Sequence, residues 1–153
     1  MAYHSVNFII DSTTYNSWTT WKLIPSSRPL INPPPVKTRK LEVPGKNGDI
    51  DLTESLVGAP TYGNRTGTIE FIVGNTYFWN VTSADEWYTV YSSILNAIHG
   101  RAGKLILEDE PSYYYEGRFA VNSWKSDTNF SRVAIDYDLG PLKYPIDGGS
   151  WRL

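Results

Sequence analysis

The chain has 153 residues, a net charge of −2 and no cysteine. This length is typical of one domain that buries an adequate core without disulfides or metals. The charge argues against a broad basic field for generic nucleic-acid binding, and the lack of cysteine excludes disulfides, thiolate metal sites and a cysteine nucleophile.

Aromatic side chains and turn-forming residues are both abundant. Aromatics make up 14% of the chain, and there are 10 prolines and 12 glycines. Large rings favour pleated surfaces and protein interfaces, and frequent Pro and Gly indicate many chain reversals. Neither a signal peptide at residues 1–20 nor an apolar stretch of roughly 18–20 residues is visible, so no membrane insertion is expected.

The first part of the chain predicts strands around an extended segment. HSVNFIID alternates apolar and polar residues, which is typical of a half-buried strand. Residues 25–36 contain five of the ten prolines, so we expect an extended arm, preceded by a short edge strand in WKLIP. A strand in KTRKLEV is followed by a loop over residues 45–62, and TGTIEFIVG predicts the next strand.

One helix is expected over residues 83–99. Ser83 and Glu86 fit a capping box, and Gly100 fits a left-handed cap at the end. Apolar residues follow at helical spacing: Trp87, Val90, Tyr91, Ile94 and Ile98. The helix should therefore lay one apolar stripe on a sheet.

Three strands joined by short turns are expected in GKLILED, YYYEGRFAVNSW and NFSRVAIDYDLG. In the last, Val133, Ile135, Tyr137 and Leu139 alternate with Arg132, Ala134, Asp136 and Asp138. The predicted fold is therefore mainly β: an antiparallel β-sandwich or open barrel with one flanking α-helix and a Pro-rich extended arm. Residues 1–145 form one domain, and residues 146–153 are expected to be a flexible tail.

No residue pattern indicates catalysis, a metal site or a cofactor. His4 and His99 are isolated, and His99 fits a helix-end residue that interacts with the dipole. The acidic run Glu108, Asp109 and Glu110 fits a solvated hairpin turn better than a calcium or glycosidase site. Tyr113, Tyr114 and Tyr115 fit packing or an interface better than a stacking platform for sugars or bases.

Three segments, in this order, resemble the distal tail proteins of long-tailed bacteriophages. They are HSVNFIIDS; the segment with Pro44, Gly45, Gly48, Asp51, Leu52 and Thr53; and AIHGRAGKLILEDEP followed by YYEGRFAV. The resemblance covers residues 4 to about 145. It implies a structural protein of the virion tail, assembled in the host cytoplasm, that forms a ring, usually a hexamer, and joins the tail tube to the tail-tip or baseplate proteins.

The resemblance also implies that DNA passes through the ring without specific binding. An extended, proline-restricted backbone loses less entropy on docking, so residues 25–36 or residues 45–56 are predicted to contact a neighbouring copy. The candidate interface residues are Arg28, Pro29, Pro33, Pro34, Pro35, Pro44, Gly45, Gly48 and Asp51. Asp136 and Asp138 are candidates for the channel lining.

Three other functions remain open at this point. Tail tube subunits share the fold, so the chain could be one of them. A carbohydrate-binding β-sandwich would use its Trp and Tyr side chains. A hydrolase with a carboxylate site that sequence spacing does not reveal is the third.

Overall fold

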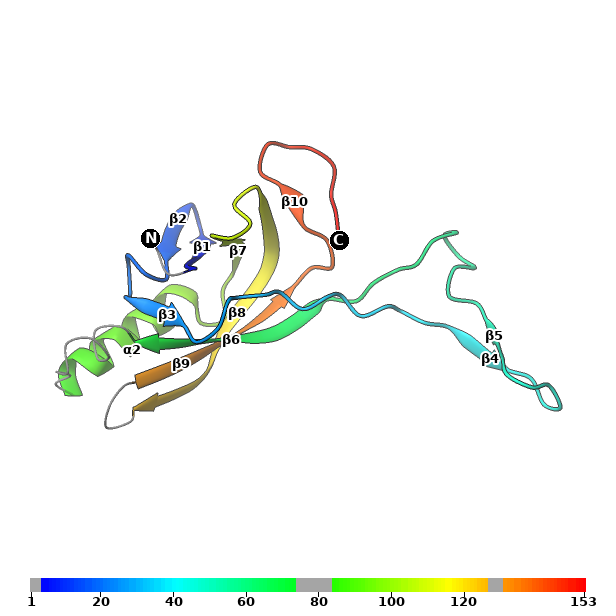
Figure 1. The fold of residues 1–153 in the computed structure, drawn as a ribbon, viewed down its shortest axis with the longest axis horizontal. Helices are drawn as coiled ribbons and strands as arrows, with labels where there is room; N and C mark the ends of the chain where they lie inside the picture. The colour runs from blue at the N-terminus through cyan, green and yellow to red at the C-terminus, as the bar shows by residue number, and fades with distance from the viewer. Residues whose placement is uncertain (1–3, 74–83, 127–130) are drawn as a thin grey trace.

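A computed structural model describes residues 4–73, 84–126 and 131–153 (Figure 1). The strands and the helix, in chain order, are β1 (Val6–Ile10), β2 (Thr13–Asn16), β3 (Leu23–Pro25), β4 (Lys40–Glu42), β5 (Asp49–Asp51), β6 (Arg65–Val73), α2 (Ala84–Ile98), β7 (Ala102–Leu107), β8 (Tyr113–Ser126), β9 (Ser131–Leu139) and β10 (Tyr144–Pro145).

Most strands form one antiparallel sheet in the order β2-β1-β7-β8-β9-β6-β3, with β10 paired to β8. β4 and β5 form a separate two-stranded sheet. The prediction of a mainly β, antiparallel fold with one helix is confirmed. The short edge strand expected in WKLIP is β3, which lies at one end of the sheet.

The sheet curls until β3, at one end, lies close to β1, near the other end. Six steps between neighbouring strands would separate the ends of a flat sheet by roughly 29 Å. Ser17, which follows β2, donates its amide to Val6 of β1 at 2.9 Å, and its carbonyl accepts the amide of Leu23 in β3 at 2.8 Å. The sheet therefore has the form of an open barrel, one of the two predicted alternatives.

The core fills the inside of this curl. Ile69, Phe71 and Val73 of β6 are buried, as the alternation predicts. Phe8 of β1 meets Phe119 of β8 edge-to-face at 5.0 Å between ring centroids. The apolar residues of β9 named above are also buried, and Arg132, Asp136 and Asp138 turn outward. Ser131 and Ala134 are buried as well, at 2% and 9% exposure.

The predicted helix is present as α2 and packs on β8 and β1. Ile94 and Ile98 are fully buried, and Val90 packs partly buried against the core. Gly100 has φ 74°, which confirms the predicted left-handed end. The capping residue Ser83 and the side chains of Glu86 and Trp87 lie outside the described residues.

The C-terminal segment folds back on itself. Lys143 and Arg152 form an antiparallel bridge, and the amide of Ile146 donates to the carbonyl of Ser112 at 2.9 Å. These bonds close a loop beside the amino end of β8 (Figure 1). The flexibility expected for residues 146–153 concerns motion and stays a prediction.

Candidate assembly surface

The largest feature outside the barrel is a projection that we call the arm, residues 33–63 (Figure 1). Its two chain segments run side by side: Lys37 donates its amide to Thr61 at 2.8 Å, and Leu52 donates to Arg39 at 2.7 Å. Of the extended segment predicted at residues 25–36, only residues 33–36 lie in this arm. The rest of its first side is the predicted strand KTRKLEV, which contains β4, and its second side is the predicted loop 45–62, which contains β5. No residue of the arm is buried.

The β4–β5 sheet within the arm has two unlike faces. Leu41 lies opposite Ile50, while Lys40 and Glu42 on the other face lie opposite Asp51 and Asp49. Leu41 is 50% exposed, and the following loop carries Leu56 and Val57 at 79% and 65% exposure. An isolated pair of strands is marginally stable in water, so an apolar face left open in this way suits docking to another surface.

The base of β5 is ordered by a small polar turn. Thr53 donates both its hydroxyl and its amide to Asp51, the amide at 3.0 Å, and it accepts the amide of Arg39 at 3.1 Å. These bonds from Thr53, aided by the charge of Lys40, hold the pKa of Asp51 below its usual range. The turn therefore connects both strands of the arm near β4.

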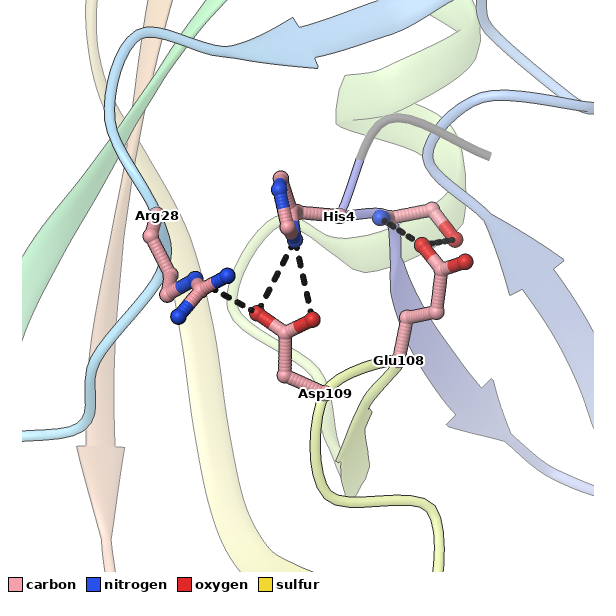
Figure 2. Close-up of polar contacts among 5 residues, drawn as sticks. His4, Arg28, Glu108 and Asp109 are labelled. Carbon is pink, nitrogen blue, oxygen red and sulfur yellow. Dashed lines mark hydrogen bonds and ion pairs between the residues drawn. The ribbon is translucent and has the colours of Figure 1, made fainter. Parts of the chain in front are cut away.

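Two anchors fix the root of the arm to the barrel. The first is ionic: Asp109 contacts His4 Nδ1 at 2.9 Å and Arg28 Nε at 3.4 Å (Figure 2). The second involves Asn32, whose amide donates to Tyr137 Oη at 3.0 Å and whose carbonyl accepts Arg65 Nη1 at 3.2 Å. The chain leaves the barrel just after these contacts.

The carboxylates of the acidic run connect three parts of the chain: the amino-terminal residues, the segment with Arg28 and the segment with Lys143. Glu108 accepts the amide of Ser5 at 2.7 Å, Asp109 makes the ionic anchor, and Glu110 pairs with Lys143 at 2.6 Å. The run does lie in a turn, as predicted. Its side chains are not only solvated, however, because they bind other segments of the chain (Figure 2). Spacing along the chain gave no signal for it, because the His4 partner is 105 residues away.

The predicted interface residues are placed as follows. Most lie on the arm: Pro33, Pro34, Pro35, Pro44, Gly45, Gly48 and Asp51. Arg28 lies before the arm and pairs with Asp109 of its own chain. Pro29 is a correction: it is buried within its own subunit, because the chain still packs on the barrel there, so it cannot face a neighbour.

The candidate lining residues Asp136 and Asp138 lie on the outer face of the sheet, away from the core. Asp136 accepts hydrogen bonds from Thr68 and Asn122, whereas Asp138 is exposed. Both border a shallow concavity of about 490 Å³ together with Arg118. Whether this face lines a channel stays a prediction.

The other singled-out residues take part in packing. Tyr115 is buried, and desolvation, followed by the charge of Glu110, raises its pKa. Tyr113 and Tyr114 are partly buried, and each has a lysine ammonium within 5 Å of its ring centroid. His99 follows α2, and its Nδ1 accepts the amide of Val121 at 3.0 Å, a role that the dipole interpretation missed.

Among residues 4–73, 84–126 and 131–153, no group of three or more His, Cys, Asp or Glu side chains is arranged to hold a metal ion. Within the same ranges, no helix combines the length and apolarity needed to cross a membrane.

Comparison with known proteins finds relatives among solved structures. No model of a known protein family matches the sequence, and no curated protein matches it either. The fold is similar to that of the SPP1 Dit (gp 19.1) protein, described as a paradigm of the hub adsorption apparatus in phages that infect Gram-positive bacteria. The TM-score is 0.62 at 16% identity, over 92% of this chain and 52% of that protein. The chain thus spans about half the length of this relative, and what the two share is the fold.

Proposed function

We propose that this chain is a structural subunit of a phage tail tip. Copies of it form a closed homo-oligomeric ring, a hexamer by its resemblance to distal tail proteins, that joins the tail tube to the tail-tip or baseplate proteins. The observation that carries the proposal is the arm: an extended two-stranded projection with an uncovered apolar face on a barrel of distal-tail type.

The arm supplies one side of the contact that a ring requires. A ring is built from a heterologous interface, in which two different patches of each subunit meet and the rotation closes. The arm reaches away from its own barrel, so its apolar face is available to a second copy and not to its own core. Leu41 and Ile50 would then be covered between subunits.

The ring encloses the path by which DNA leaves the tail. A conduit of this kind works best when its wall does not attract phosphates. The outer face of the barrel suits this role because Asp136 and Asp138 offset the positive charge of Arg118 beside them. No chemistry on a substrate is part of the proposal.

The proposal is tested by comparing two neighbouring charge substitutions on β4. Leu41→Glu places a charge on the apolar face, while Glu42→Lys changes charge on the opposite face, where it replaces a like-charge pair with Asp49 by an opposite-charge pair. Sedimentation velocity should show that wild type and Glu42→Lys assemble while Leu41→Glu stays a folded monomer. Assembly of Leu41→Glu at wild-type strength would rule out the arm's apolar face as the interface.

A further inference from the structure

An arm that must meet a neighbour is most effective when its direction is set in advance. The arm contains no buried residue, so its own packing does not determine where it points. Its direction depends on the root, where the ionic anchor and the Asn32 anchor hold the chain. The two anchors differ in how much they are shielded from water.

The ionic anchor is exposed. The side chain of Arg28 is 66% exposed and that of Asp109 is 34% exposed. Exposed ion pairs contribute little and are screened by salt. This contact is therefore too weak to set the direction of the arm by itself.

The Asn32 anchor is built on buried side chains. Tyr137 is 4% exposed and Arg65 is 5% exposed. Besides its bonds to these two residues, Asn32 donates its side-chain amide to the carbonyl of Thr66 at 2.8 Å. Three bonds of different direction thus fix Asn32, which is itself exposed. Breaking the bonds to Tyr137 and Arg65 would leave polar groups of two buried side chains without these partners.

Gly67 provides the space for this arrangement. It lies opposite Tyr137 in the β6–β9 register, and a Cβ on it would lie 2.4 Å from Tyr137 Oη and 2.5 Å from Asn32 Nδ2. Any larger residue would displace one of the two groups. Arg65 also donates its Nε to the carbonyl of Pro141 at 3.1 Å, which joins the root of the arm to the segment after β9.

We infer that Asn32, Arg65 and Tyr137 form a clamp that sets the direction of the arm before a neighbouring copy is met. They are positioning residues for assembly: they act through the root and do not themselves lie on the apolar face. A preset arm loses less conformational freedom on docking, so the clamp strengthens association. The effect on association rests on the proposed function. The direction of the arm in the free subunit can be tested separately.

The direction of the arm can be measured in the monomer. The chain has no cysteine, so Lys46→Cys at the tip of the arm and Glu116→Cys on the barrel accept two spin labels specifically. Leu41→Glu is added to keep the labelled protein monomeric. Double electron–electron resonance between the two labels should give a narrow distance distribution with the clamp intact. The distribution should be broad in the Asn32→Ala, Tyr137→Phe double variant.

Two variants separate positioning from folding. Tyr137→Phe alone keeps the core ring and removes only the hydroxyl, so it should broaden the distribution while thermal melting stays cooperative. Asn122→Ala is the matched control, because Asn122 donates to Asp136 on the same sheet but does not contact the arm. An unchanged distribution in both Tyr137→Phe and the double variant would overturn the inference.

Association of the unlabelled chain supplies the second readout. Without Leu41→Glu, the Asn32→Ala, Tyr137→Phe double variant should associate about tenfold more weakly or worse, and Asn122→Ala should match wild type. Equal association despite a broadened arm would overturn the positioning role. If wild type itself fails to associate, the proposed function fails, and the distance distributions still decide whether the clamp exists.

Discussion

Tyr137 and Asn32 join the centre of the sheet to the root of the arm: the hydroxyl oxygen of Tyr137 accepts the backbone amide of Asn32 at 3.0 Å. Their meeting depends on the bare backbone of Gly67. The clamp therefore links the packing of the barrel to the position of the arm.

Gly67→Ala should destabilise the protein by about 1–3 kcal/mol, because the new methyl group overlaps Tyr137 Oη and Asn32 Nδ2. Denaturant unfolding measures the change. Gly140→Ala is the control, since a Cβ there would make only an ordinary contact with the carbonyl of Glu116 at 3.6 Å. Equal stability of Gly67→Ala and wild type would show that Tyr137 and Asn32 can move aside at little cost in free energy.

Ile94→Ala should cost about 2–5 kcal/mol, because Ile94 is fully buried between α2 and the sheet. Ser92→Ala, on the exposed side of the same helix, should change the free energy of unfolding by less than about 0.5 kcal/mol. Chemical denaturation followed by tryptophan fluorescence gives both values. A small effect for Ile94→Ala would mean that the helix does not pack on the sheet in solution.

The Asp51–Thr53 turn should make the arm less ordered at acidic pH. The pKa of Asp51 is lowered in the folded arm, so its contribution is present above the ordinary value of about 3.9 and is lost as pH falls through the folded pKa. Thr53→Val removes the hydroxyl donor and should raise the pKa of Asp51 toward that ordinary value. Carboxyl NMR titration reads this directly, and Thr61→Val should leave the Asp51 titration unchanged.

The passive conduit can be tested by charge reversal. In the assembled protein, wild type should bind labelled duplex DNA weakly at physiological salt, because its wall offers no net attraction for phosphates. Asp138→Lys should raise DNA binding more than Asp147→Lys, which makes the same charge change on the C-terminal loop. Tight, salt-sensitive DNA binding by wild type would contradict a passive conduit, and equal effects of the two variants would remove Asp138 from the lining.

Periodic patterns in the sequence predicted the regular elements of the fold and the residues that those elements bury. The alternation in β9 and the helical spacing in α2 each require one face to be buried, so those strands, the helix and their buried residues could be read along the chain. The run of prolines predicted where the extended arm begins, because proline restricts the backbone wherever it lies, but it placed the arm at residues 25–36 and not at 33–63. Its second side was predicted only as a loop.

Contacts between distant segments could not be predicted in this way. Asp109 and His4 are 105 residues apart, and so are Asn32 and Tyr137. Such pairs depend on the order of strands in the curled sheet, which periodicity does not determine. Pro29 shows the same limit: its composition suggested an interface, but its neighbours in space bury it.

Native mass spectrometry of the wild-type chain tests the central claim most directly. The account predicts one dominant closed assembly, six copies by the family resemblance, with no series of larger species. The assembly should dissociate to monomers in Leu41→Glu but not in Glu42→Lys. A wild-type chain that remains a monomer at high concentration would contradict the ring.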